Sequence, residues 1–341
     1  MSSPRVTIHE VARTAGVSVA TVSKVINDRY GVAAGTSERV REVIDQLGYE
    51  SSLVARSLRS SRTSVLGILV AEFEPFSAEI LKGASRAITG TGYELLAYSA
   101  GASGPAQHPG WERRHLRRLA GTLIDGAVLV TPTVVDTGVS VPVVAIDPHT
   151  GPAGMPTIDS DNHSGAVAAT EHLLALGHER IGFLAGRPDL ESSRLREAGF
   201  RSAMAAAGLA VDERLVVPGD YRREDALEPS RGMLARADRP TAVFAANDLM
   251  ALAALDVAAE LGLDVPRDLS VVGFDNVPES ALCDPPLTTI SQPMQQMGAE
   301  AVTMLLGLLA AGEEAEPASP AHVQLPTGLV VRSSTAPPAP R

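Results

Sequence analysis

The chain has 341 residues, a length that predicts two or three domains and a hydrophobic core that needs no disulfide or metal to hold it. Apolar residues make up 45% of the sequence and charged residues 20%, which excludes a disordered chain, and no apolar run is long enough to span a membrane. Cys283 is the only cysteine and the first residues are polar, so we expect no internal disulfide, no signal peptide and a cytoplasmic protein.

Charge is unevenly distributed along the chain. The whole sequence carries a formal net charge of −11, whereas residues 1–62 hold nine basic and six acidic side chains. A basic head on an acidic body is typical of a protein whose head meets the phosphates of a nucleic acid and whose body does not.

The first sixty residues predict three short helices. Thr7 and Glu10 have the spacing of a capping box, and the apolar face that follows ends at Gly16. Ser18 begins a second helix after a short turn, and a third helix ends at Gly48. Two short helices joined by a turn and braced by a third are found in a helix-turn-helix and also in a plain three-helix bundle.

The outward face of the second helix separates these two alternatives. It carries small or polar side chains and one cation, namely Val19, Ala20, Ser23, Lys24 and Asn27. No acidic residue lies between Ser18 and Asn27, although a solvated face usually mixes both signs of charge. This face favours a helix-turn-helix whose second helix enters the major groove of DNA.

The run VTIHEVARTAGVSVATVSKVIN resembles the amino-terminal signature of the LacI/GalR family of bacterial repressors, and the likeness continues to Leu58. The resemblance implies contacts to DNA bases from Val19, Ala20, Lys24, Ala55 and Leu58. It implies contacts to DNA phosphates from Thr7, Ser18, Thr21, Ser23 and Asn27. Lys24 stands where many relatives have arginine, so it can donate to guanine but lacks the planar fork of a guanidinium group.

Residues 51–62 form a basic, serine-rich linker. The resemblance implies a hinge helix here, formed when a dimer meets DNA, with Leu58 wedged into the minor groove where it bends the duplex. The alternative is that Leu58 closes the core of the head. Ser51 and Ser52 replace the Pro-Asn pair of many relatives, and a serine can still cap the start of a helix.

Apolar strands alternate with helices from residue 63 onward, which predicts parallel sheets covered by helices. About 280 residues exceed one average sheet, so we expect two subdomains, and the resemblance implies a doubly wound α/β body like that of periplasmic binding proteins. The expected divisions are a head at 1–50, a hinge at 51–62, a body at 63–335 and a disordered tail at 336–341. Within the body, the amino subdomain is expected at 64–160 plus 292–321, and the carboxyl subdomain at 161–291 plus 322–335.

Polar and aromatic side chains follow the predicted strands, where the ligands of open parallel sheets bind. They include Glu72, Glu74, Asp147, Arg187, Tyr221, Asn247 and Asp275. The resemblance implies effector contacts from Phe76, Ser77, Asp161, Arg196, Tyr221, Asn247 and Asp275. Carboxylates, amides, an arginine and an aromatic ring favour a sugar as the ligand. Helix caps at Asp161 and Asn247, a turn at Asp275 and a surface ion pair at Arg196 are the alternatives.

These features predict a DNA-binding transcriptional regulator that controls genes of sugar catabolism. We expect a homodimer on double-stranded DNA with a near-palindromic operator and a small-molecule effector, with no cofactor and no membrane association. We expect no metal site, because His172 and His178 do not share a helix face, and no catalytic site, because no nucleophile or phosphate-loop motif is present. The alternatives are a sugar-binding transport component and a sugar-modifying enzyme with a DNA-binding head.

Overall fold

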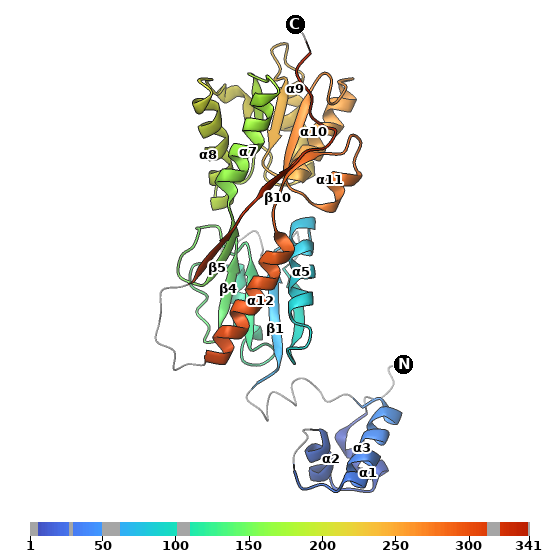
Figure 1. Cartoon of the computed structure of the whole chain (residues 1–341). Coiled ribbons are helices and arrows are strands. Elements are labelled where there is room, and N and C mark those ends of the chain that lie inside the picture. Colours follow the sequence, from blue (N-terminus) through green and yellow to red (C-terminus); the bar gives the residue numbers. More distant parts are fainter. Residues whose placement is uncertain (1–5, 27–29, 50–61, 101–109, 312–320, 340–341) are drawn as a thin grey trace. The chain divides into compact units, whose positions relative to one another are not determined.

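A computed structural model of the chain describes residues 6–26, 30–49, 62–100, 110–311 and 321–339 (Figure 1). It consists of two compact units, a head that ends at Thr63 and a body that begins at Ser64. The buried apolar side chains of the head and of the body form separate hydrophobic cores.

The described residues of the head form three helices, α1 (Ile8–Ala15), α2 (Val19–Ile26) and α3 (Ala34–Leu47). The predicted capping box is confirmed, because the Thr7 N–H donates to Glu10 Oε2 (2.7 Å) and the Glu10 N–H donates to Thr7 Oγ1 (3.4 Å). Gly16 and Gly48 end α1 and α3 with φ values of 67° and 61°, which glycine adopts without strain. The core between the helices is made of small and β-branched side chains, namely Val11, Ala12, Ala15, Val22, Val25, Val40 and Val43.

In the part of the body that the structure describes, the strands form two six-stranded sheets, which confirms the predicted α/β class. All neighbours in the first sheet are parallel, in the order β11 (His322–Leu325), β5 (Thr157–Ser160), β4 (Val143–Ile146), β3 (Gly126–Val130), β1 (Val65–Val70) and β2 (Glu94–Ser99). The second sheet has the order β12 (Gly328–Val330), β10 (Thr288–Ser291), β9 (Ser270–Asp275), β8 (Ala242–Ala245), β6 (Ile181–Ala185) and β7 (Val216–Pro218). Its strands are parallel except for β12, which runs antiparallel to β10.

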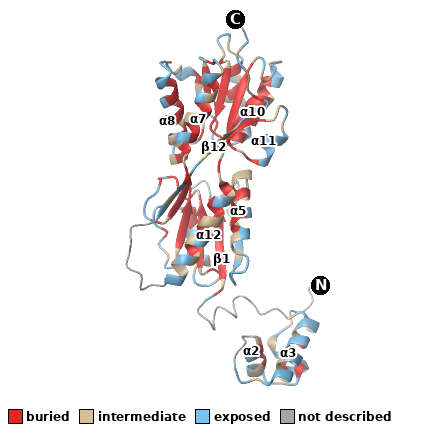
Figure 2. Cartoon of the chain, in the orientation of Figure 1, coloured by how far each residue is buried: buried red, intermediate tan, exposed pale blue. Residues whose placement is uncertain are grey.

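Helices cover the sheets, so the central strands are buried while the outward helix faces are exposed (Figure 2). The amino subdomain carries α5 (Pro75–Ala87), α6 (Trp111–Leu119) and α12 (Met294–Ala311). The carboxyl subdomain carries α7 (Asn162–Ala175), α8 (Glu191–Ala206), α9 (Arg223–Leu234), α10 (Asp248–Glu260), α11 (Pro278–Leu282) and a 3-10 turn, Glu213–Leu215.

Helices α5 and α12 cross unusually closely. A Cβ added at Gly83 would lie 1.8 Å from the carbonyl oxygen of Gln295, so only glycine allows this approach. The contact joins two segments that are more than 200 residues apart in the sequence (Figure 1). It thereby completes the amino subdomain with a helix that follows the carboxyl subdomain in the chain.

The chain crosses between the subdomains three times. The first two crossings join β5 to α7 and β10 to α12. The third differs from the expected boundary at 321/322, because His322–Leu325 pairs with β5 and therefore belongs to the amino sheet. Leu325 is buried in the core of that subdomain, which fixes the strand there. The crossing lies between Leu325 and Gly328.

The carboxyl tail is ordered further than expected. The Thr288 N–H donates to the buried Ser334 Oγ (2.8 Å), and the Ala336 N–H donates to Ser270 Oγ (3.0 Å). His178 Nε2 lies 2.9 Å from the carbonyl oxygen of Ala336. The prediction of disorder from residue 336 is therefore wrong for Ala336, and residues 340–341 lie outside the described part.

None of the helices in the described residues has the length and apolar character that a membrane span requires.

Candidate functional site

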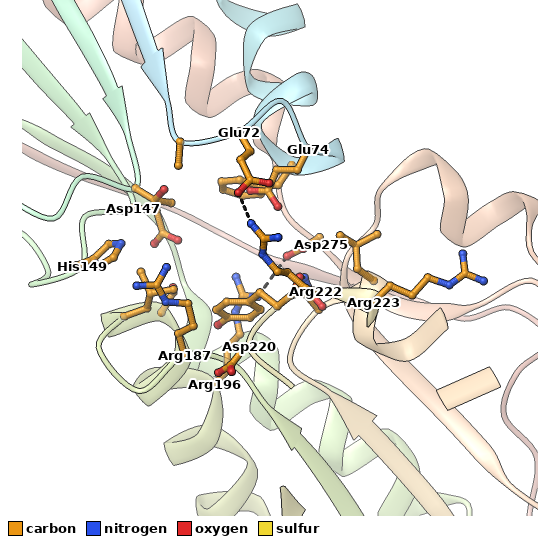
Figure 3. A pocket seen from close by; sticks show the side chains of 18 of the residues that line it. Glu72, Glu74, Asp147, His149, Arg187, Arg196, Asp220, Arg222, Arg223 and Asp275 are labelled. Carbon is orange, nitrogen blue, oxygen red and sulfur yellow. Dashed lines mark hydrogen bonds and ion pairs between the residues drawn. The ribbon is translucent and has the colours of Figure 1, made fainter. Parts of the chain in front are cut away.

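A cavity of about 360 Å³ opens between the two subdomains of the body (Figure 3). Its volume is in the range of small-molecule sites. Residues that follow strands of both sheets line it, among them Glu72, Glu74, Phe76, Thr131, Asp147, His149, Arg187, Tyr221, Asn247 and Asp275. The carboxyl ends of strands from both sheets therefore meet at this cavity, as expected for open α/β sheets.

The backbone around the cavity is strained. Seven non-glycine residues in the described part have positive φ, and five of them line the cavity: Thr131, Asp147, Asp220, Tyr221 and Asp275. Asp275 has φ of 111°, where an L side chain rarely lies. Such conformations persist only where the surrounding structure enforces them, and they concentrate at functional sites.

Arg196 lies at the centre of the polar groups. It is 3% exposed, its Nη1 lies 3.3 Å from Asp275 Oδ1, and its Nε donates to Asn162 Oδ1 (2.8 Å). Its guanidinium group also donates to the carbonyl oxygen of Ala246 (2.5 Å) and lies over the ring of Phe274, 3.9 Å from the centroid. Arg196 is therefore a buried, hydrogen-bonded cation and not the partner of a surface ion pair.

Three carboxyl groups at the cavity resist ionisation. Burial raises the pKa of Asp275 to about 6, and the nearby Arg196 opposes this shift. Burial, and then the charge of Asp275, raises the pKa of Glu74 to about 7. Burial also raises the pKa of Asp147. The cavity is thus an acidic site in which carboxyl groups lack bulk water.

The two subdomains contact each other at two places beside the cavity. Glu72 of the amino subdomain forms an ion pair with Arg222 of the carboxyl subdomain (Figure 3). At the other side the carbonyl oxygen of His149 accepts bonds from the Glu191 N–H (3.0 Å) and from Arg194 Nη2 (3.1 Å). These contacts hold the two subdomains together across the cavity.

Five of the seven predicted effector residues line the cavity: Phe76, Arg196, Tyr221, Asn247 and Asp275. Asn247 also caps α10, since its Oδ1 accepts from the Met250 N–H (2.9 Å), so both interpretations of this residue apply. Ser77 and Asp161 do not line the cavity. The buried hydroxyl of Ser77 donates to the carbonyl oxygen of Glu72 (2.7 Å), and Asp161 caps α7 by accepting from the Ser164 N–H (2.9 Å).

The effector contacts that the resemblance implies omit several side chains that line the cavity. Asp147 directly follows β4 and Glu74 caps α5 after β1, so the pattern of polar residues at strand ends already indicates both. Trp111 also lines the cavity and begins α6, and Arg222 begins α9 as its cap. Nothing in the local sequence indicates that these two side chains reach the cleft, because their position depends on long-range packing.

The second helix of the head presents the predicted DNA-reading residues. Ala20 and Lys24 are exposed, and Val19 is half-buried because it also packs on the head's core. Ser18 Oγ accepts from the Thr21 N–H (3.1 Å) and lies 2.9 Å from Thr21 Oγ1, so it begins α2 as predicted. Thr7 is exposed and Ser23 half-buried. Asn27, Ala55 and Leu58 lie outside the described residues.

Comparison with known proteins matches both parts of the chain. Residues 7–52 match the family model "Bacterial regulatory proteins, lacI family", and residues 170–335 match "Periplasmic binding protein-like domain". The HTH-type transcriptional repressor PurR of Photobacterium profundum is 37% identical over 311 residues, which cover 88% of this chain and 91% of that protein.

Two solved structures are similar over nearly the whole chain. A complex of the transcriptional regulator CelR with cellobiose is 35% identical, with a TM-score of 0.70, and covers 97% of this chain and 100% of its own. The lac repressor dimer bound to operator and the anti-inducer ONPF is 29% identical, with a TM-score of 0.82, and covers 97% of this chain and 99% of its own.

A helix-turn-helix head joined to a two-subdomain α/β body with a small-molecule cleft defines a class of DNA-binding regulators. The chain belongs to the LacI family of bacterial regulatory proteins. It is a DNA-binding transcriptional repressor and not an enzyme.

Proposed function

We propose that this repressor senses a sugar in the cleft of its body and that the sugar lowers its affinity for operator DNA. Among the described residues, six acidic side chains and four arginines line the cavity. Each of these arginines forms an ion pair with an acidic side chain. A phosphorylated ligand would need cations that are free to bind it. A ligand rich in hydroxyl groups suits buried carboxyl groups that form no ion pair within the described residues and can exchange hydrogen bonds with it, such as Glu74 and Asp147.

The observation that carries the sugar proposal is the meeting of Asp275, Asp147 and Glu74 with two aromatic side chains, Phe76 and Tyr221, in one cavity. Carboxylates accept from sugar hydroxyls, and aromatic rings pack on the C–H faces of a sugar. The cellobiose in the structure of the similar CelR supports the same class of ligand. The name PurR of other relatives makes purines the competing class.

On the DNA side we propose base contacts from Val19, Ala20 and Lys24 and phosphate contacts from Thr7, Ser18, Thr21 and Ser23, together with Asn27. We also propose that residues 51–62 act as a hinge in which Ala55 and Leu58 reach the minor groove. Two protomers would then place their α2 helices in successive major grooves of a near-palindromic operator. The dimeric lac repressor on its operator supports this arrangement, and action on bacterial DNA implies a cytoplasmic site.

A thermal-shift screen of the full-length protein tests the effector. The panel contains mono- and disaccharides including cellobiose, their phosphates, and purines. A ligand that binds only the folded protein raises the midpoint, by about 2.7 kcal/mol of stabilisation at a hundredfold excess over its dissociation constant. A shift with an unphosphorylated sugar supports the proposal, whereas a shift with purines alone would replace the sugar by a purine.

A further inference from the structure

The chain crosses three times between the two subdomains of the body, and these crossings form a second hinge, separate in sequence from residues 51–62. Buried side chains connect the three crossings. The first crossing follows β5 at Ser160, the second follows β10 at Ser291, and the third follows β11 at Leu325. Asp161 links the first crossing to the third, because its N–H donates to the carbonyl oxygen of Leu325 (2.8 Å) and its own carbonyl oxygen accepts from Thr327 Oγ1 (3.1 Å). The first and third crossings are therefore joined by hydrogen bonds through Asp161.

Gln292 connects the first crossing to the second. Its side chain lies between β10 and α12 and is 4% exposed. Its Oε1 accepts a hydrogen bond from the hydroxyl of Ser160, which is fully buried at the end of β5. Its Nε2 donates to Asp275 Oδ1 (2.6 Å). One amide thus joins a strand of the amino sheet to the carboxyl group that lines the effector cavity.

The connections close into a ring. Asp275 lies 3.3 Å from Arg196 Nη1, Arg196 Nε donates to Asn162 Oδ1 (2.8 Å), and Asn162 Nδ2 donates to the carbonyl oxygen of Ser160 (3.0 Å). All five residues of this hinge ring, Ser160, Asn162, Arg196, Asp275 and Gln292, are at most 5% exposed. Two of them line the cavity and the other three sit at the crossings.

We propose that Ser160, Asn162 and Gln292 are positioning residues that couple Asp275 and Arg196 to the hinge. A ligand that bonds to Asp275 or Arg196 changes the hydrogen bonding of Gln292 and Asn162, and these two side chains pass the change to the crossings. Both amides use their oxygen and their nitrogen within the ring, so neither can turn without breaking a buried bond. The inference rests on the proposed function of the cleft, and it assigns the side chains that transmit the response.

Hydrogen exchange of the full-length, ligand-free protein tests the ring without knowledge of the effector. In Ser160→Ala the amino subdomain loses one hydroxyl, and we expect exchange to speed up by about three- to tenfold in peptides that span Asp275 to Val277 in the carboxyl subdomain, as loss of a buried hydrogen bond predicts. A merely local role of Ser160 would leave these peptides unchanged. Ser270→Ala, a buried serine at the far end of β9, is the matched control and should not affect them.

A second variant keeps the test decisive if one protein folds poorly. Gln292→Met removes both bonds of the amide at similar volume and should speed up exchange around Asp275 and around Ser160. Adding Ser160→Ala to Gln292→Met should give no further increase, because Ser160 acts through Gln292. Additive effects, or no change around Asp275 in either single variant, would overturn the proposal. Failure of every ligand in the thermal-shift screen would instead overturn the proposed function and leave this result standing.

Discussion

The head and the cleft of the body place their functional side chains in opposite ways. In the head, Ala20 and Lys24 lie exposed on a short helix whose core is formed by neighbours close in sequence. In the body, Arg196 and Asp275 are buried and meet from segments 79 residues apart. The head therefore tolerates change at its functional surface, whereas the cleft uses the same side chains for binding and for stability. Substitutions in the two regions should differ accordingly in what they damage.

The largest effect is expected at Arg196. Arg196→Met should lower the free energy of unfolding by about 3–5 kcal/mol, because it leaves the buried Asp275 without its cation. Urea unfolding measures the loss. Arg267→Ala removes an arginine whose side chain is 70% exposed and should cost less than about 1 kcal/mol. Equal losses in the two variants would contradict the burial argument for the cleft.

Substitution of Glu74 should raise the free energy of unfolding, whereas substitution of Arg196 lowers it. The gain at Glu74 should appear only above acidic pH. A folded-state pKa of about 7, raised from 4.5, means that ionising Glu74 costs stability, a cost that grows as pH rises from about 4.5 and is complete above about 7. Glu74→Gln removes this cost and should raise the free energy of unfolding by about 1–3 kcal/mol at pH 8 and leave it nearly unchanged at pH 4.

Urea unfolding at both pH values measures this difference. Thr303→Ala, an exposed position on α12 whose hydroxyl donates to the carbonyl oxygen of Ala299 (3.0 Å), removes no ionisable group, so its effect on stability should be the same at pH 4 and pH 8. A Glu74→Gln protein that gains no stability at pH 8 would show that the cavity leaves this carboxyl group well solvated. The comparison would then lose its claim that the side chains in the cleft act on binding and on stability at once.

In the head, Lys24→Ala should change recognition and leave stability alone. An exposed lysine in the major groove discriminates by about 1–3 kcal/mol against the wrong base, so preference should relax at one base pair in each half-site. Selection of operators from random duplexes measures the preference. Lys82→Ala on α5 of the body is the control, and an unchanged preference in Lys24→Ala would remove this residue from the reading surface.

The smallest effect is expected at the start of α2. Ser18→Ala deprives the Thr21 N–H of its acceptor and should destabilise the head by about 1 kcal/mol. Thermal melting followed by circular dichroism detects the change. Thr14→Ala, exposed near the end of α1, should have a smaller effect. Equal effects would mean that the cap contributes little.

The same contrast explains how far the sequence predicts the structure. Helix periodicity, the Thr7 cap and two glycines locate the three helices of the head, because local interactions determine them. Alternating strands and helices predict the α/β body, and strand ends predict the side of the sheets on which the cavity lies. The location of Trp111 and Arg222 at the cavity depends on distant packing, which no short sequence window contains.

Two predictions from the sequence are wrong for the same physical reason. His322–Leu325 was expected in the carboxyl subdomain, and residue 336 in a disordered tail, yet both are fixed by partners far away in the sequence. A four-residue edge strand and a Pro/Ala-rich tail have little pattern of their own. Asp161 and Ser77 show the opposite case, in which local contacts explain a residue that is predicted to bind the effector. A hydrogen bond to the nearby backbone accounts for each side chain without an effector.

The most direct test of the cleft's control over the head is operator affinity measured with and without the sugar that emerges from the screen. In the wild-type protein the sugar should weaken operator binding by about five- to 150-fold, and operator DNA should weaken sugar binding by the same factor. Asp275→Ala should keep its operator affinity within about threefold and lose the response to the sugar. An Asp275→Ala protein that responds as the wild type does would contradict the assignment of this cleft as the effector site.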